Sequence, residues 1–467
     1  MGETQAVATV VEPGTPIPVA APDGAASSPA ENPPPRQAPR RSTPVRLGVW
    51  TAVVGVCIAL LLGVMVAAIT AARDGAATVA SRAASASEAS DLYFALADLD
   101  TEAARLVLLG GGTPPGGTTA TFGGNQLTAL IDFNQRNTQI DGDLAELAAS
   151  GQPGDAATVS QLAQDITTYR DIASAAAAMD ESANDNAGAP AGQPLQFAVG
   201  YYSRATSIMQ GQILPEARAL SSAKAAQLAD AAHSAKLAGL LGAIAAGVVG
   251  LIAVVITLAA HRRVAGWFRR RVNLGLVVAA VLSAVLGIGA ATSLASSASD
   301  SSDAGSRFAS YLTVTYAQTD SYTADGDAVR ILVLPGIGSS TTRADVNTVT
   351  GELQQLGSDP LAQEAVTRWK KAGDGDILAI VGDAQKGDVS AALSRDTGVG
   401  RGEEAFDFSY YDLALSTLAD ERLASFQSAS AADNSALADW SWLPWALALA
   451  ALVALGLGVR SRFAEYR

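Results

Sequence analysis

The chain has 467 residues, of which 49% are hydrophobic and only 16% are charged, and its formal net charge at pH 7 is −14. This composition is too apolar for an ordinary soluble protein. The single cysteine, Cys57, and the two histidines cannot build a His/Cys metal cluster. We therefore expect a membrane protein that carries no metal and no other cofactor.

Four windows of the chain contain no Asp, Glu, Lys or Arg and reach the roughly 20 residues that a helix needs to cross a bilayer. The first window is too long for the apolar part of a signal peptide and follows a long polar tail, so we interpret it as an uncleaved anchor. The sequence therefore predicts four transmembrane helices, at 46–72, 237–260, 272–295 and 440–459.

The charges outside these windows predict the orientation of the chain. The segments 1–46, 261–271 and 460–467 together hold 12 basic and five acidic residues, whereas 73–236 holds nine basic and 18 acidic, and 296–439 holds 10 basic and 22 acidic. Short basic segments stay in the cytoplasm. We therefore expect a multi-pass protein of the cell membrane, with both termini and the Arg-rich loop 261–271 inside and the two large acidic segments outside.

The elements between the spans are predicted to be helical. The tail 1–45 is rich in Pro and Ala and cannot bury enough apolar surface to fold, so we expect it to be disordered. Segment 73–236 contains helical stretches at 73–109, 125–149 and 155–184 and a last one from 195 into the second span, which predicts a four-helix bundle. Segment 296–439 is predicted to be a second helical domain, with short helices or irregular chain at 373–402, where glycines interrupt it. The fold class is thus all-α with no sheet.

The two outer segments resemble each other. Asp100-Thr101-Glu102-Ala103-Ala104-Arg105 precedes an apolar run and glycines, and Asp325-Gly326-Asp327-Ala328-Val329-Arg330 does the same 225 residues later. Tyr201-Tyr202 likewise corresponds to Tyr410-Tyr411, and we expect these pairs to lie in the helical core with one ring exposed. The sequence therefore predicts an internal duplication of the unit span, outer domain, span.

Five charged residues of the repeated stretch are candidate partner contacts. Asp98, Glu102 and Arg105 share one helix face, and Asp327 and Arg330 have the same spacing in the second copy. A ligand or partner is one interpretation, since a guanidinium group binds carboxylates well. The alternative is an exposed helical ion pair, which contributes a few tenths of a kcal/mol.

The inner side offers a second candidate contact. Trp267 lies beside Arg269 and Arg270 in the loop 261–271. Anionic lipid headgroups attract such a cluster, and the alternative is a docking point for a cytoplasmic partner. In the second span, Gly242, Ala246 and Gly250 form a stripe of small residues that favours close packing within the four-span unit over a dimer contact.

No catalytic motif accompanies these features. The sequence has no GxxxxGK[ST] loop, no HExxH helix and no nucleophile elbow in a strand-to-helix setting. The loop 261–271 is too short for a kinase or cyclase domain, and the spans lack the charges that mark ion pathways. We therefore expect neither an enzyme nor a transporter, but a receptor-like protein whose output depends on a separate cytoplasmic protein.

The chain resembles the actinobacterial GlnX-type membrane proteins over residues 45–467. The shared features are four spans, two tandem helical outer domains, the repeated acid-x-acid-Ala-x-Arg pattern and basic inner segments. The resemblance implies a signal relay between an extracytoplasmic lipoprotein that binds glutamate, aspartate or glutamine and the cytoplasmic serine/threonine protein kinase G. A variant of this hypothesis is direct binding of an amino acid by the outer bundle. The alternative from another class is a structural scaffold of a transporter or of a cell-envelope complex.

Overall fold

A computed structural model describes residues 43–110, 119–150, 154–187, 191–268, 273–336 and 339–464. The chain divides into two units, Met1–Arg46 and Leu47–Arg467, and the account below concerns the second unit. The predicted disordered tail 1–45 falls almost wholly outside the described residues. Those residues form helices joined by short connections and include no β-strand, which confirms the all-α fold class.

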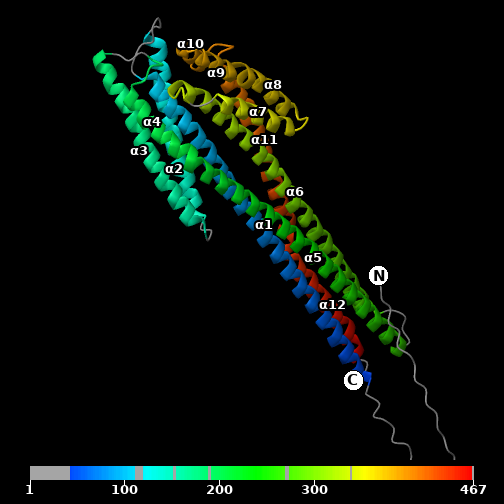
Figure 1. Cartoon of the computed structure of the whole chain (residues 1–467). Coiled ribbons are helices and arrows are strands. Elements are labelled where there is room, and N and C mark those ends of the chain that lie inside the picture. The colour runs from blue at the N-terminus through cyan, green and yellow to red at the C-terminus, as the bar shows by residue number, and fades with distance from the viewer. Residues whose placement is uncertain are drawn as a thin grey trace, which may run out of the picture. The chain divides into compact units, whose positions relative to one another are not determined.

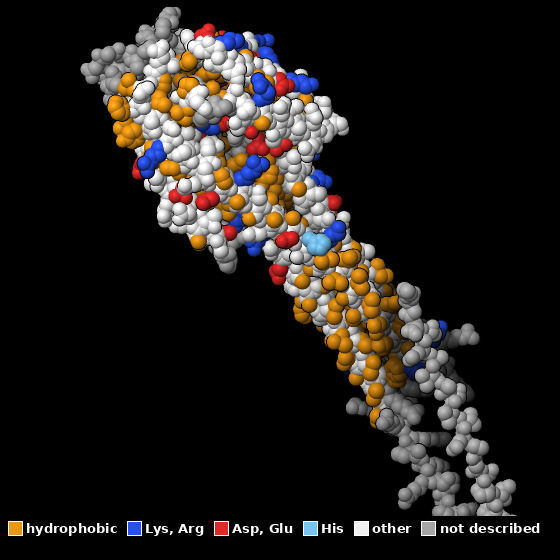
Figure 2. All heavy atoms as spheres, viewed as in Figure 1, with side chains coloured by type: hydrophobic (Ala, Val, Ile, Leu, Met, Phe, Trp, Pro, Cys, Tyr) orange, Lys and Arg blue, Asp and Glu red, His pale blue; other side chains and the backbone are white. Residues whose placement is uncertain are grey.

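Four helices carry segments that are long and apolar enough to cross a membrane: α1 (Thr43–Leu109), α5 (Leu214–Phe268), α6 (Leu274–Val333) and α12 (Leu443–Ala464). They run side by side, and α1, α5 and α6 continue well beyond this shared region (Figure 1). Hydrophobic side chains gather on the surface over the shared region, while charged side chains gather beyond it (Figure 2). This separation of apolar and charged surface is the arrangement expected of a membrane protein.

Small residues bring the spans into close contact. A Cβ atom added to Gly250 of α5 would lie 2.9 Å from the Cα of Gly287 in α6, and one added to Gly242 would lie 3.0 Å from the Cβ of Ala68 in α1. Only small residues permit such an approach of two backbones. The small-residue stripe of the second span therefore packs within the four-span unit, as the sequence indicated.

The segment 73–236, called the first outer segment after its predicted location, adds three helices to the part of α1 that lies beyond the candidate span. These are α2 (Thr119–Ala149), α3 (Asp155–Ala187) and α4 (Gln196–Ile208). A π-helical turn, η1 (Met209–Ile213), joins α4 to α5, so that one long helical rod leads from the outer bundle into the second span. The sequence predicted this continuity but not the π-turn, which places an additional residue in one turn and is often found at functional sites.

The second outer segment packs around the outer part of α6 and contains shorter elements. They are α7 (Ser340–Gln355), α8 (Pro360–Lys371), the π-turn η2 (Ala372–Ile377), α9 (Leu378–Gln385), α10 (Val389–Asp396), α11 (Glu404–Ala438) and the 3₁₀ turn η3 (Asp439–Ser441) that precedes α12. The glycine-interrupted region 373–402 thus forms short helices, one of the two forms the sequence allowed.

The two outer segments share one hydrophobic core. Buried residues of α1, α3 and α4 belong to the same cluster as buried residues of α6, α8 and α11. The helices α2 to α4 lie on one side of the α1–α6 pair and α7 to α11 on the other (Figure 1). Tyr202 and Tyr411 are fully buried in this core, while Tyr201 and Tyr410 are 43% and 47% exposed, which confirms the predicted pattern of one buried and one exposed ring.

Candidate functional site

The helices α1 and α6 lie parallel and in register along the axis of the outer part. The hydroxyl of Ser90 donates to the hydroxyl of Thr315 at 2.9 Å, and these residues are 225 positions apart. Closer to the outer ends, a Cβ atom on Gly326 would clash with Oγ1 of Thr101. The glycine therefore permits a close crossing of α1 and α6. The same offset relates the two copies of the repeated sequence, so equivalent residues face each other across this crossing.

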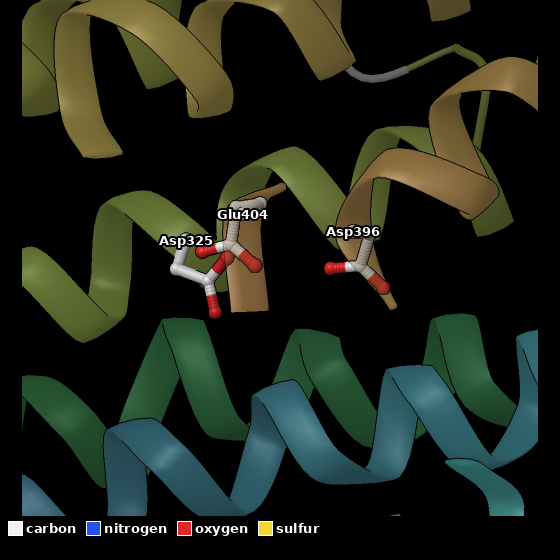
Figure 3. Close-up of side chains that lie close together, drawn as sticks. All are labelled: Asp325, Asp396 and Glu404. Atoms are coloured by element: carbon white, nitrogen blue, oxygen red, sulfur yellow. The ribbon is translucent and has the colours of Figure 1, made fainter. Parts of the chain in front are cut away.

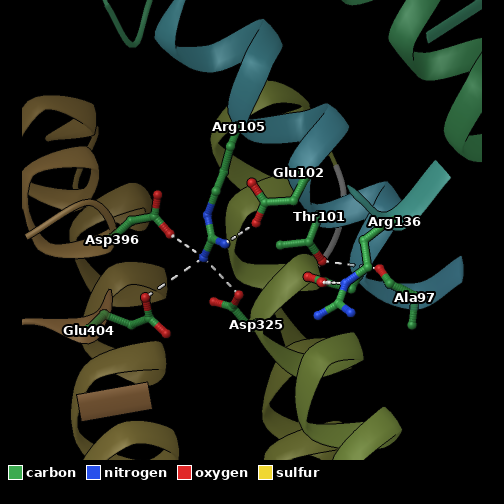
Figure 4. A network of polar contacts seen from close by, with 9 residues as sticks. Ala97, Thr101, Glu102, Arg105, Arg136, Asp325, Asp396 and Glu404 are labelled. Carbon is green, nitrogen blue, oxygen red and sulfur yellow. Dashed lines mark hydrogen bonds and ion pairs between the residues drawn. The ribbon is translucent and has the colours of Figure 1, made fainter. Parts of the chain in front are cut away.

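Arg105 binds carboxylates of both helices at the crossing. Its Nη1 lies 2.7 Å from Oε1 of Glu102 in α1, and its Nη2 lies 2.8 Å from Oδ2 of Asp325 in α6. Figure 4 shows the guanidinium group between these two carboxylates. Because Glu102 and Asp325 are at most 6% exposed, the contacts are buried ion pairs and not solvated ones.

Arg330 repeats this arrangement with the helices exchanged. It forms an ion pair with Asp327, three residues earlier in α6, and its Nη2 lies 3.0 Å from Oδ2 of Asp100 in α1. Each arginine thus binds the carboxylate three residues before it and the first carboxylate of the repeated motif on the other helix. Two reciprocal ion pairs therefore link α1 to α6. We call these two arginines and their carboxylate partners the ion-pair cluster.

The surroundings of the two halves differ. Around Arg105, two further carboxylates approach from the second outer segment: Oδ1 of Asp396 in α10 at 3.3 Å and Oε2 of Glu404 in α11 at 3.8 Å (Figure 4). Both side chains are 0% exposed. Four carboxylates thus surround one guanidinium group. Both oxygens of Glu404 are buried and have no hydrogen-bond partner among the described residues.

Around Arg330, neutral donors take the place of these additional carboxylates. Oδ1 of Asp100 accepts a hydrogen bond from the Tyr169 hydroxyl at 3.0 Å, and Oδ2 accepts one from Thr206 and one from Gln210, each also at 3.0 Å. A buried carboxylate with this number of donors is well satisfied. This half of the cluster is therefore balanced by hydrogen bonds, and the Arg105 half is not.

The excess of buried carboxylates changes the acid–base behaviour of the Arg105 half. Burial raises the pKa of Glu102 to about 8 although Arg105 lowers it, and burial together with Asp396 raises the pKa of Asp325 to about 6. Burial and the adjacent Asp325 raise the pKa of Glu404 well above its usual range. Near neutral pH, this half therefore holds protons that solvent-exposed carboxyl groups would have released.

The same carboxylates form the one group among the described residues with the spacing of a metal site. Oxygens of Asp325, Asp396 and Glu404 lie within 4.8 Å of one another (Figure 3). However, Nη2 of Arg105 lies within 3.8 Å of all three carboxylates and supplies the positive charge there. A divalent cation would have to displace a buried guanidinium group. We therefore assign this cluster to charge pairing and not to metal binding.

A pocket of about 640 Å³ adjoins the Arg330 half of the cluster. Asp327 and Arg330 form part of its wall, and Ser203, Thr206 and Gln210 of α4 and η1 add polar groups. Nε of Arg330 is buried and has no hydrogen-bond partner among the described residues. The pocket therefore gives a small molecule direct access to the side chains that hold Asp100 and Arg330 together.

The structure brings some of the candidate residues from the sequence together and places others elsewhere. Glu102, Arg105, Asp327 and Arg330 meet in the ion-pair cluster, whereas Asp98 pairs with Arg136 of α2. The alternative interpretation of an exposed helical ion pair is wrong, because Asp98, Glu102, Asp327 and Arg330 are at most 6% exposed. The cause is the second helix, which covers the polar face. Trp267, Arg269 and Arg270 lie outside the residues whose side chains the structure describes.

Four residues of the cluster were not selected from the sequence as contacts. Asp100 and Asp325 open the two copies of the repeated motif, so their common position was a usable signal. Asp396 lies within the glycine-interrupted region and Glu404 lies just after it, where the two copies no longer correspond. No spacing in the sequence connects them to Arg105, which is 291 residues before Asp396.

Comparison with known proteins finds a similarity for the first outer segment. The family model described as "Actinobacterial sensor domain" matches residues 75–233. No curated protein and no solved structure matches the chain. The matched segment contains the residues that α1 contributes to the ion-pair cluster and the residues that α4 contributes to the wall of the adjoining pocket. The match supports an actinobacterial sensor protein.

Proposed function

We propose that this chain is a transmembrane sensor that relays an extracytoplasmic signal to a cytoplasmic partner. The ion-pair cluster is the observation that carries the proposal. It links α1 and α6 at their outer ends, and both helices continue without interruption into candidate membrane spans. A change in the relative position of α1 and α6 at the cluster is therefore transmitted along two continuous helices.

The length of these helices supports a mechanical role. Helix α1 has 67 residues, and at a rise of about 1.5 Å per residue it is about 100 Å long. A ligand or partner protein that binds one arrangement of the cluster better than another shifts the population of the two arrangements. Helix shifts of about 1–2 Å are typical of such transitions.

We propose a solute-binding lipoprotein that carries an amino acid as the outer partner and a serine/threonine protein kinase as the inner partner. The resemblance to GlnX-type proteins suggests both. The structure adds that α5 ends at Phe268 and α6 begins at Leu274. Because this connection is too short for a catalytic domain, output at this point requires a separate protein.

The proposal is tested in cells that lack the chain and are complemented with variants of it. One variant carries Ser90→Cys and Thr315→Cys in a Cys57→Ala background, so that oxidation locks α1 to α6. We expect phosphorylation of the kinase's substrates to respond to added amino acid in the wild type, and the response to disappear on oxidation and to return on reduction. Amino-acid uptake should not change.

The matched control carries Ser90→Cys alone, which cannot form the internal bridge. Equal abundance of all variants in the membrane is checked by immunoblotting. The relay would be refuted if substrate phosphorylation still responded to added amino acid as in the wild type, either in the oxidised locked variant or in cells without the chain. Altered assembly of envelope or transporter complexes, with unchanged phosphorylation, would instead identify the chain as a scaffold.

A further inference from the structure

A second pocket lies on the surface of the second outer segment, between α8 and the beginning of α11. Its volume is about 370 Å³. Its wall combines three basic side chains, two aromatic rings and one carboxylate: Arg368, Lys371, Arg401, Phe406, Tyr410 and Asp407. It is separate from the ion-pair cluster and shares no residue with it.

The basic side chains give this pocket a charge opposite to that of its surroundings. The segment 296–439 contains 10 basic and 22 acidic residues, and three of those basic residues line this one pocket. Asp407 compensates Lys371, whose Nζ lies 2.7 Å from one of its oxygens. Arg368 pairs with Glu364, which does not line the pocket, and Arg401 is exposed. An anion is therefore attracted to this part of an otherwise acidic surface.

One of these cations, Arg368, is held in a fixed orientation at the pocket wall. The side chain is 14% exposed and is fixed by bonds to Glu364 and to the carbonyl oxygen of Tyr410. A guanidinium group held in this manner loses little entropy when it binds a carboxylate.

The aromatic rings supply a flat apolar wall. Phe406 and Tyr410 lie one helical turn apart on α11, with ring centroids 6.2 Å apart and planes inclined by 19°. The guanidinium carbon of Arg368 lies 3.4 Å from the centroid of the Tyr410 ring. Tyr410 is 47% exposed, whereas its neighbour Tyr411 is fully buried and holds this part of α11 in place. The wall is thus rigid and accessible to a ligand.

The pocket also lies at the N-terminal turns of α11, which begins at Glu404. Free amide groups and the helix dipole favour negative charge at such an end. The first outer segment repeats the aromatic pattern, because Phe197 and Tyr201 precede Tyr202 with the same spacing and line a pocket of about 460 Å³. That pocket contains one cation, Arg204, so the pocket at α11 is the stronger anion site.

We propose that the pocket between α8 and α11 binds a small organic carboxylate with an apolar or aromatic body, and that this binding changes the ion-pair cluster. The carboxylate lies against Arg368 and Arg401, and the body of the ligand lies on Phe406 and Tyr410. Glu404 connects the two sites, because it is two residues before Phe406 and lies 3.8 Å from Arg105. The binding site stands by itself, while its signalling role rests on the proposed relay.

Binding is tested by 19F NMR on the full chain in lipid nanodiscs, with 4-fluorobenzoate as the probe and 4-fluorobenzamide as its uncharged equivalent. We expect saturable line broadening of the benzoate that empty nanodiscs do not cause, and much weaker broadening of the amide. Arg401→Gln should weaken binding of the benzoate about 1.5- to fivefold, because it removes one exposed ion pair. Arg343→Gln, which changes an exposed arginine of α7, should have no effect.

Three results would overturn the binding site: no saturable broadening at millimolar benzoate, equal broadening of the amide and the benzoate, or a loss of benzoate affinity in the Arg343 variant equal to that in the Arg401 variant. The coupling is measured separately as the rate of disulfide formation between cysteines at 90 and 315. We expect 4-fluorobenzoate to change this rate in the double-cysteine protein that retains Glu404. It should not change the rate when Glu404→Gln is added. Binding without any change of rate would refute the coupling but not the pocket, and absence of binding would leave the relay standing.

Discussion

Substitution of the two arginines of the ion-pair cluster by glutamine should have unequal and differently pH-dependent effects on stability. Arg105→Gln removes the guanidinium group that lies within 3.8 Å of four buried carboxylates. Removal of one partner from a buried ion pair costs about 3–5 kcal/mol. We expect a loss of this size in the free energy of unfolding at pH 8.

The pH dependence follows from the raised pKa values. Glu102, with a pKa of about 8, and Asp325, with a pKa of about 6, hold protons in the folded protein that the unfolded chain releases above about pH 4. Their contribution to stability is therefore present at low pH and is lost as the pH rises to about 8. Without Arg105 their pKa values rise further, so this loss becomes larger. At pH 5 Glu102 and Asp325 are largely protonated, and the substitution should cost only about 1 kcal/mol.

Arg330→Gln should depend less on pH. Asp100 keeps three neutral hydrogen-bond donors in this variant. The titrating group nearby is Asp345, whose pKa burial and Asp327 raise to about 7. We expect a loss of about 2–3 kcal/mol, close to the strength of hydrogen bonds to a charged group, with a shallower increase towards pH 8 than in the Arg105 variant.

The assay is urea-induced unfolding of the full chain in nanodiscs at pH 5, 6.5 and 8, followed by circular dichroism at 222 nm. The spans stay helical in the bilayer, so the transition reports the outer part. The reasoning would be refuted if Arg105→Gln lowered the free energy of unfolding by the same amount at all three pH values. It would also be refuted if Arg330→Gln showed the steeper pH dependence.

Three further predictions concern the packing and orientation of the helices. With Cys57 replaced by Ala, cysteines at Ser90 and Thr315 should form a disulfide in membranes on mild oxidation, because these hydroxyls are 2.9 Å apart; failure to crosslink on non-reducing gels would contradict the register of α1 and α6. Gly250→Leu should lower the thermal midpoint of the purified chain, since its side chain would meet the α6 backbone at 2.9 Å, and an unchanged midpoint would contradict that packing. A cysteine at Thr341, which is exposed on α7, should react with an impermeant maleimide in intact cells, and protection there would reverse the predicted topology.

The sequence predicted the four apolar helices and their long extensions because both depend on local physics. A run of about 20 residues without charge is sufficient to predict a span, and the absence of proline from 73–109 is sufficient to predict that α1 continues beyond it. The glycines of region 373–402 likewise indicated short elements, and the structure has η2, α9 and α10 there. The packing of the two outer segments into one core depends on distant residues and was not predicted.

The burial of the cluster shows the limit of pattern reasoning most clearly. Glu102 and Arg105 at spacing i, i+3 have the same appearance in a sequence whether the helix face meets water or a second polar face. One signal pointed to burial: Leu99, Ala103 and Val107 place apolar side chains around the same stretch of α1. A helix that is apolar on most sides is usually enclosed, so its charged residues need partners from another element.

The unequal halves of the cluster suggest where a signal enters and how it reaches the membrane. The Arg330 half is balanced by neutral donors, and a movement of Arg330 or of these donors would break hydrogen bonds to Asp100. The Arg105 half holds more carboxylates than one guanidinium group satisfies, so a small movement of Glu404 in α11 changes its proton content at little cost. At its other end, α11 meets α1 again, because Nη2 of Arg73 donates to the carbonyl oxygen of Ala438 at 3.3 Å. A displacement of α11 is therefore felt by α1 both at the cluster and next to the first span, and α12, the fourth span, follows η3 directly.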